Sequence, residues 1–230
     1  MRTVLTSTLD RINAAHPWSH NDAYHRWILR QVPSRASTAI DVGCGTGNLV
    51  RALARRVDRA TGIDTDPAVV DLARSRSTAL PTATFEVRDL RAPPVGSVFD
   101  VVTAVAVVHH LPLPTALARL RSLVAPGGRV VVVGCYRAAT RGDRLLDLVA
   151  VPANLVMGLL LSARSSEARV AMSAPTAPPT TTLAEVRAVA AQLLPGARVR
   201  RRLFWRYSLV YSAPGRLAPG QKPNVTIGSR

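Results

Sequence analysis

The most regular hydrophobic pattern of this 230-residue chain lies between residues 38 and 134. Short runs rich in β-branched residues alternate there with turn signals and with segments of helical periodicity. Runs such as 130–133, which reads VVVV, contain no polar residue, so these strands are expected to be buried on both faces. The pattern predicts strands at 38–42, 60–64, 83–87, 99–107 and 129–134, and helices at 48–56, 68–74 and 114–124.

This alternation predicts an α/β fold with a doubly wound, mostly parallel sheet. Asp66 followed by Pro67 marks a helix start, since aspartate caps helices and proline suits their first position. The proline and glycines at 126–128 indicate a turn before the fifth strand. A helix at 183–194 and strands at 198–204 and 207–211 follow. We expect about seven strands in all, with an antiparallel closing strand.

Composition is that of a globular protein. The chain is 47% hydrophobic and 19% charged, which is too apolar for a disordered polypeptide. The apolar run at 145–161 is too short and too interrupted to cross a bilayer, and residues 1–18 contain no apolar signal core. A cytoplasmic location is therefore expected. Cys44 and Cys135, the two cysteines, are expected to stay reduced and separate.

Charge first suggests a nucleic-acid or membrane partner, because the formal net charge is +16. Of the 30 basic residues, 29 are arginines, and they are spread along the whole chain. The densest group, residues 198–206, also has the alternating pattern of a strand, and aromatic residues make up only 4% of the chain. We therefore interpret the arginines as a solvated surface and do not expect a nucleic-acid partner.

A glycine-rich loop follows the first strand. Residues 41–47 read D-x-G-x-G-x-G, and such glycines allow a sharp turn and let a ligand approach the backbone. The dinucleotide fingerprint would require a glycine where the chain has Asn48. The carboxylate of Asp41 would repel a pyrophosphate but would suit a ligand that carries an ammonium group. S-adenosylmethionine carries such a group.

The segment IDVGCGTG at 40–47 resembles the glycine motif of class I S-adenosylmethionine-dependent methyltransferases. FDVVTAVAVVHHL at 99–111 and LVAPGGRVVVVG at 123–134 are similar to later motifs of that family. The resemblance covers about residues 35–135, and FWRYSLVY at 204–211 extends it weakly. It implies a Rossmann-like fold, S-adenosyl-L-methionine as cofactor and transfer of a methyl group.

The resemblance also implies roles for particular residues. Asp41 and the loop glycines Gly43, Gly45 and Gly47 would hold the methionine part of the cofactor. Asp64, with its neighbour Thr65, would bind the ribose hydroxyls. Asp89 and Leu90 of VRDL would face the adenine, and the backbone near Ala104 in the fourth strand would also contact the methionine part.

The five histidines fall into two clusters, at residues 16–25 and at 109–110. In the family the segment before the first strand commonly folds over the cofactor, so the clusters would face each other across the acceptor pocket. If the acceptor is a hydroxyl, His110 and His20 are the candidate bases. Trp18, Tyr24 and His109 are candidate acceptor-binding residues, although His109 could instead pack behind the strand. No zinc or other metal site is expected, because no HExxH or cysteine pattern accompanies the early histidines.

The sequence thus predicts a methyltransferase that acts on a small, apolar or aromatic acceptor. Residues 1–36 would form a helical cap over the active site, 37–213 the cofactor-binding domain with a lid-like insertion at 137–182, and 214–230 a disordered tail. An RNA methyltransferase, an NAD-dependent oxidoreductase and a non-catalytic binding module are alternatives. Methylation of nucleic-acid base amines is disfavoured, since residues 104–107 read AVAV where such enzymes have an Asn-Pro-Pro-Tyr type motif.

Overall fold

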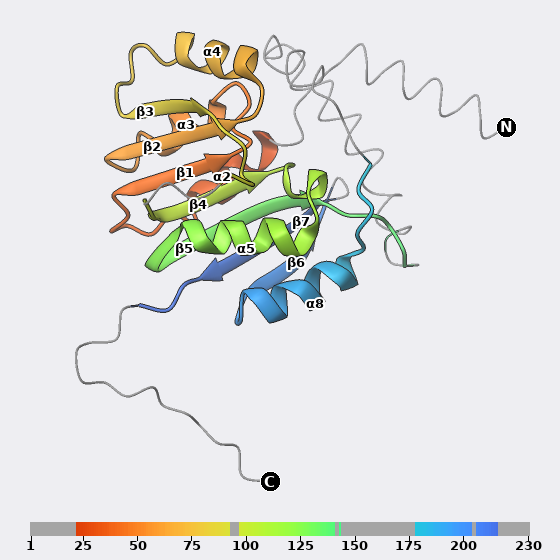
Figure 1. Cartoon of the computed structure of the whole chain (residues 1–230). Coiled ribbons are helices and arrows are strands. Elements are labelled where there is room, and N and C mark those ends of the chain that lie inside the picture. The colour runs from red at the N-terminus through yellow and green to blue at the C-terminus, as the bar shows by residue number, and fades with distance from the viewer. Residues whose placement is uncertain (1–21, 93–96, 141–142, 144–177, 204–205, 216–230) are drawn as a thin grey trace, which may run out of the picture.

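The computed structural model describes residues 22–92, 97–140, 143, 178–203 and 206–215. Its strands are β1 (Thr38–Val42), β2 (Arg59–Asp64), β3 (Ala83–Val87), β4 (Phe99–Val105), β5 (Val124–Cys135), β6 (Arg198–Arg202) and β7 (Arg206–Ser212). They form a seven-stranded sheet of order β3-β2-β1-β4-β5-β7-β6 (Figure 1). The first five strands are parallel to one another, and β7 is antiparallel to both β5 and β6. The predicted fold class is therefore confirmed.

Helices cover both faces of this sheet. They are α2 (His25–Leu29), α3 (Asn48–Leu53), α4 (Pro67–Ser75), α5 (Leu113–Leu123) and α8 (Leu183–Leu193), with 3₁₀ turns η1 (Asp22–Tyr24) and η2 (Val108–His110). Helices α5 and α8 pack together over one face, and α2, α3 and α4 pack on the other (Figure 1). None of the helices in the described residues is long and apolar enough to cross a membrane.

The run of valines in β5 explains how two cores form. Val130 and Val132 belong to the core under α5 and α8, whereas Val131 and Val133 belong to the core under α2 and α3. All four valines have no exposed surface. Alternate side chains of a strand point to opposite faces, so a strand buried on both sides reads as a continuous apolar run.

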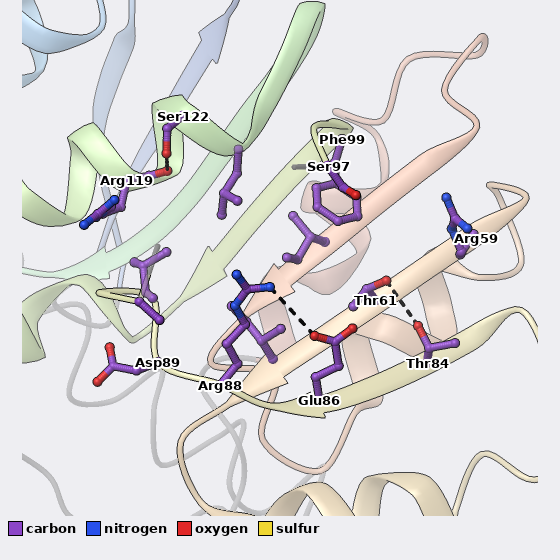
Figure 2. A pocket seen from close by; sticks show the side chains of 15 residues that line it. Arg59, Thr61, Thr84, Glu86, Arg88, Asp89, Ser97, Phe99, Arg119 and Ser122 are labelled. Carbon is purple, nitrogen blue, oxygen red and sulfur yellow. Dashed lines mark hydrogen bonds and ion pairs between the residues drawn. The ribbon is translucent and has the colours of Figure 1, made fainter. Parts of the chain in front are cut away.

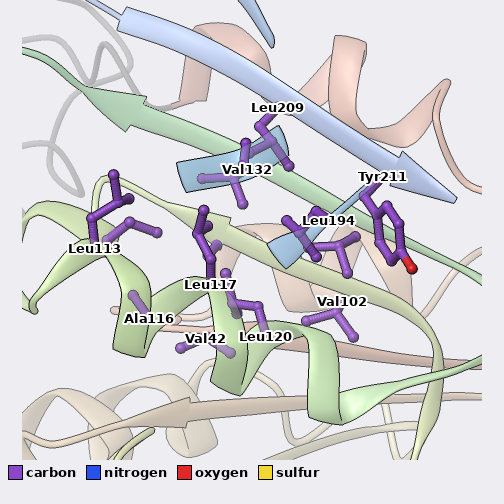
Figure 3. Packing of buried hydrophobic residues seen from close by; sticks show 14 of the residues in the cluster. Val42, Val102, Leu113, Ala116, Leu117, Leu120, Val132, Leu194, Leu209 and Tyr211 are labelled. Atoms are coloured by element: carbon purple, nitrogen blue, oxygen red, sulfur yellow. The ribbon is translucent and has the colours of Figure 1, made fainter. Parts of the chain in front are cut away.

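Two helices complete the first of these cores. Leu117 and Leu120 of α5 gather with Val102 and Val132 of the sheet, and Leu194 closes the cluster from the end of α8 (Figure 3). Each of these five side chains is fully buried. Burial of each large apolar side chain contributes about 1.5–3 kcal/mol, and this is the main force that holds α5 and α8 against the sheet.

Several element boundaries differ from the prediction. Strand β4 ends at Val105 and not at 107, because Ala106 has a left-handed backbone with a φ of 55°. Strand β5 begins at Val124, so the predicted turn at 126–128 lies within it as an irregular pairing with β4. Helix α3 ends at Leu53 and not at 56.

The predicted cap, insertion and tail lie largely outside the described residues. Residues 1–21 of the cap, 141–142 and 144–177 of the insertion, and 216–230 of the tail are not described. The described part of the cap is η1, α2 and the segment that leads to β1.

Candidate active site

A cavity of about 610 Å³ opens at the carboxyl ends of the central strands. Its walls come from the loop after β1, the ends of β2 and β3, and the segment after β4. It is lined by Val42, Gly43, Gly45, Thr46, Ile63, Asp64, Thr65, Asp66, Val69, Arg88, Asp89, Leu90, Arg91, Val105, Ala106, Val107, His110 and Leu111. This is the edge at which open α/β sheets bind ligands.

The glycine loop forms one wall of this cavity. The backbone N–H groups of Gly43 and Cys44 both donate to the carbonyl oxygen of Ile63, at 2.8 and 3.0 Å, which fixes the loop to β2. A Cβ at Gly47 would lie 2.6 Å from the ring of Phe85, and one at Gly43 would collide with Val107. A Cβ at Gly45 would meet no atom within 4 Å. Of these three positions, only Gly45 could therefore carry a side chain that projects into open space.

Asp64, at the end of β2, is tied to the same loop. One carboxylate oxygen accepts a hydrogen bond from the N–H of Gly45 at 2.9 Å, and the other accepts from the N–H of Asp66 at 3.2 Å. Each carboxylate oxygen has a second lone pair, so Asp64 can also accept bonds from two hydroxyl groups of a ligand. Asp66 caps α4 as predicted, by accepting from the N–H groups of Ala68 and Val69.

Asp89 and Leu90 follow β3 and form a third part of the wall. The guanidinium of Arg91 donates to both carboxylate oxygens of Asp89, with its shortest contact at 2.6 Å. This hydrogen bonding lowers the pKa of Asp89 from its usual range. Asp89 is thus an ionised acceptor that already has a cationic partner.

A second cavity of about 380 Å³ meets the first at Ile63, Arg88, Asp89 and Leu90. It lies against the sheet face that α5 borders, where Thr61 and Thr84 share a hydrogen bond of 3.1 Å (Figure 2). Arg119 and Ser122 of α5 form its far side (Figure 2). Apolar side chains, among them Ile40, Phe99 and Leu123, line it together with these polar groups.

Asp41 and Ala104 do not line the main cavity. Asp41 is only 3% exposed and its carboxylate accepts a hydrogen bond of 2.6 Å from the Thr103 hydroxyl. Burial raises the pKa of Asp41 to about 7, although the bond from Thr103 opposes the rise. Ala104 is buried, and Val105, Ala106 and Val107 form the wall where the sequence predicted Ala104.

The two neighbouring histidines have different surroundings. His110 is exposed and lines the cavity. His109 is half-buried, its Nδ1 has no hydrogen-bond partner, and its ring centroid lies 4.1 Å from that of His110. Burial and then the charges of His110 and Arg206 lower the pKa of His109 to about 4. His109 is therefore neutral at pH 7.

The remaining predicted residues are distributed as follows. Gly47 packs against Phe85 behind the cavity wall. Tyr24 is outside the cavity, and its hydroxyl donates to the carbonyl oxygen of Leu203 at 2.7 Å. His20 and Trp18 lie outside the described residues.

Several wall residues were not predicted. Arg91 follows Asp89 by two positions, so a basic residue close to the VRDL motif was the available signal. Ala106 and Val107 reach the cavity because the chain turns at Ala106, and a positive φ at alanine has no sequence signature.

Comparison with known proteins gives consistent findings. Residues 39–128 match the family model described as "Methyltransferase domain". The chain is 35% identical over 203 residues to the uncharacterized methyltransferase Mb0092 of Mycobacterium bovis, covering 86% of this chain and 98% of that protein. It is also 35% identical over 109 residues to the ubiquinone biosynthesis O-methyltransferase of Xanthomonas axonopodis pv. citri, covering 45% of each.

A solved structure shares the fold. The N-methyltransferase NodS from Bradyrhizobium japonicum superposes with a TM-score of 0.55 at 16% identity, covering 84% of this chain and 96% of that one. The family match, the similarity over nearly the whole of a methyltransferase relative and the shared fold confirm the resemblance seen in the motifs. The chain belongs to the class I S-adenosylmethionine-dependent methyltransferases.

Proposed function

We propose that the 610 Å³ cavity is the cofactor site and that the chain methylates a small, apolar or aromatic acceptor that enters beside His110. One observation carries this proposal. The glycine loop, Asp64 and Asp89 come from three different strands, and they meet His110 in a single cavity. The cavity is also large enough for a nucleoside-sized ligand, within the usual range of small-molecule sites.

The chain's residues fit S-adenosylmethionine in three respects. The open space at Gly45 is a cradle that a side chain would fill. Asp64, beside Thr65, has lone pairs for the two ribose hydroxyls, and Asp89 with Leu90 offers an acceptor and an apolar surface for adenine. Asp41 directly precedes the loop and interacts electrostatically with Asp64 and Cys44, so a bound ammonium group would favour its ionised form.

The cofactor supplies an activated methyl group, so the protein mainly has to align the acceptor and exclude water. We assign His110 as the base if the acceptor is a hydroxyl, because it is exposed and lines the cavity. The imidazole of His109 is neutral and its pKa is lowered to about 4, so it is a weak base. It is therefore better suited to form a wall of the acceptor site than to accept a proton. Tyr24, Trp18 and His20 stay candidates for the acceptor side.

Relatives support a small-molecule acceptor. The trans-aconitate 2-methyltransferase of Methylobacterium radiotolerans is 38% identical over 127 residues, and the ubiquinone biosynthesis enzyme is 35% identical over 109. This chain spans about half the length of each. Their names concern small molecules, which favours this substrate class over RNA and over NAD-dependent oxidation.

The test combines binding with turnover. S-adenosylmethionine and NAD are titrated against the protein, and formation of S-adenosylhomocysteine is then measured with a panel of phenols and carboxylic acids. We expect binding of S-adenosylmethionine alone and turnover of at least one acceptor. Tight binding of NAD, or cofactor binding with no turnover of any acceptor, would contradict the proposal.

His110→Gln is the first variant to test. Turnover of a phenol should fall by about 10²–10⁴ at neutral pH, while cofactor affinity stays within twofold of wild type, because the imidazole would act on the acceptor. The loss should shrink as the pH approaches the phenol's own pKa. His109→Gln is the comparison, and an equal loss of turnover in both variants at every pH would mean that both histidines only shape the acceptor site.

A further inference from the structure

The sheet continues beyond the cavity to a group of basic residues at the same edge. Arg202 ends β6 and Arg206 begins β7, and the two residues are cross-strand partners. Arg206 is also paired with Cys135 at the end of β5. Strand β5 in turn neighbours β4, whose end leads into the cavity wall and the histidines. The two arginines therefore lie on the acceptor side of the sheet edge.

The side chain of Arg202 is held in one orientation. Its guanidinium lies over the ring of Trp27, with 4.8 Å between the central carbon and the ring centroid. Its Nε donates to the Ser208 hydroxyl at 2.9 Å. Stacking on a tryptophan and one hydrogen bond fix the plane of the group while its terminal nitrogens keep their donors. Among the described residues, no carboxylate pairs with Arg202.

The surroundings of Arg202 are positive. The described part of the β6–β7 hairpin contains no acid, and Asp143, which contacts the hairpin, is engaged by Arg201 at 3.0 Å and by its own loop. Burial raises the pKa of Tyr24, and the charges of Arg206 and Arg202 oppose that rise. The charge of Arg206 also acts on His109, whose ring centroid lies 4.1 Å from that of His110. A positive potential thus extends from β6 toward the cavity.

We propose that Arg202 binds a carboxylate of the methyl acceptor, which makes the acceptor an acid with its reacting group at the opposite end. The planar fork of a fixed guanidinium matches the two oxygens of a carboxylate. This inference rests on the proposed function, because it assumes that methyl transfer occurs beside His110.

Sheet geometry gives the approximate shape of that acceptor. Three inter-strand spacings separate β6 from β4, or about 14 Å at 4.7–4.9 Å each. The side chain of Arg202 reaches Ser208 on β7, which is one strand closer to β4. An elongated acid fits the remainder, with an apolar or aromatic body between its two polar ends, and 4-hydroxycinnamate has these features.

The test uses matched neutral and charged probes. 4-Hydroxycinnamate and its uncharged amide, and 4-hydroxybenzoate and its amide, are titrated against the full chain saturated with S-adenosylhomocysteine. For at least one pair we expect the acid to bind roughly 10- to 100-fold more tightly than the amide, the usual effect of a charged hydrogen bond. Arg202→Gln should abolish this preference, and Arg202→Lys should retain part of it.

Arg198→Gln is the matched control. Arg198 lies on the same strand and the same face as Arg202, but at the far end and exposed. This variant loses the same charge and should keep the preference for acids. A preference that survives Arg202→Gln, or that disappears equally in Arg198→Gln, would overturn the proposal. So would acids that bind no better than their amides.

Cofactor affinity, measured on the same preparations, separates this inference from the proposed function. Wild type that does not bind S-adenosylmethionine refutes the proposed function. Wild type that binds it and transfers methyl groups, but does not prefer acids, refutes only the role of Arg202. Cofactor affinity and melting temperature of Arg202→Gln close to wild type establish that the variant is folded.

Discussion

Gly45 differs from its neighbours because a side chain at this position would project into the 610 Å³ cavity that we propose binds the cofactor. Its φ is 52°, so an alanine there is strained by about 1–2 kcal/mol. Gly45→Ala should lower affinity for S-adenosylmethionine at least tenfold and lower the melting temperature slightly. Isothermal titration and thermal unfolding measure both effects.

Gly196 provides a matched control for that substitution. It has a φ of 83°, and a Cβ there would also meet no atom within 4 Å, but it follows α8 and is not part of the cavity. Gly196→Ala should lose similar stability and bind the cofactor normally. Equal cofactor affinity in both variants would place the ligand away from the loop.

The glycine loop also separates what the sequence could and could not reveal. The sequence predicted the position of the loop after β1 and of Asp64 after β2, because the carboxyl ends of parallel strands lie at the same edge of a sheet. The distinct roles of the glycines were not readable. Gly47 is required by the ring of Phe85, which lies 38 residues away in the chain and contacts it only after folding.

At the level of elements, α8 begins with a complete capping box. The Thr182 hydroxyl accepts from the N–H of Glu185 at 3.3 Å, and the Glu185 carboxylate accepts from the N–H of Thr182 at 2.6 Å. Thr182→Ala should lower the free energy of unfolding by about 1 kcal/mol, because the N–H of Glu185 at the helix start loses its partner. Urea unfolding measures this change.

Thr180→Ala is the matched control for the cap. Thr180 is exposed, and its described contact is made by its backbone carbonyl, which accepts from Arg137 and is kept in alanine. Its free energy of unfolding should change by less than about 0.5 kcal/mol, as for most surface substitutions. A similar loss in both variants would mean that the capping box contributes nothing measurable.

Element boundaries were predictable where local chemistry sets them. Strand β1 begins and ends as expected, and Asp66-Pro67 starts α4, because β-branched runs and caps act within a few residues. The start of β5 was not predictable, because Val124 becomes a strand residue by pairing with Phe99 of β4. The end of β4 depends on the turn at Ala106, whose N–H donates to Val133.

At the level of the whole molecule, two buried groups give opposite dependence of stability on pH. Burial raises the pKa of Asp41 to about 7, so the folded chain holds a proton that the unfolded chain releases above pH 4. Its contribution to stability therefore falls between about pH 4 and 7, by at most about 1.4 kcal/mol per pH unit.

His109 acts in the other direction. Burial lowers its pKa to about 4, so between about pH 4 and 6.5 the unfolded chain binds a proton that the folded chain does not. Its contribution to stability rises with pH in that range. The slope is smaller than for Asp41, because His109 is only half-buried and solvent screens it.

Single substitutions should separate the two contributions. Relative to wild type, the free energy of unfolding of Asp41→Asn should rise more steeply from pH 4.5 to 6.5, and that of His109→Gln should rise less steeply or fall. Urea unfolding at several pH values provides both curves. Asp71→Asn, in an exposed pair with Arg74, is the control, and three parallel curves would contradict the assignment.

The arginines of β6 also govern how separate copies of the protein meet. Strand β6 is an edge of the sheet that the described residues form, and an open edge is a template on which a strand of another molecule can add and start an aggregate. Four of its five residues are arginines, so two edges that approach one another repel. At 1 M salt, where charges act over only about 3 Å, this protection should weaken. Light scattering should then detect self-association, and at a lower salt concentration in the double variant Arg198→Thr, Arg200→Thr.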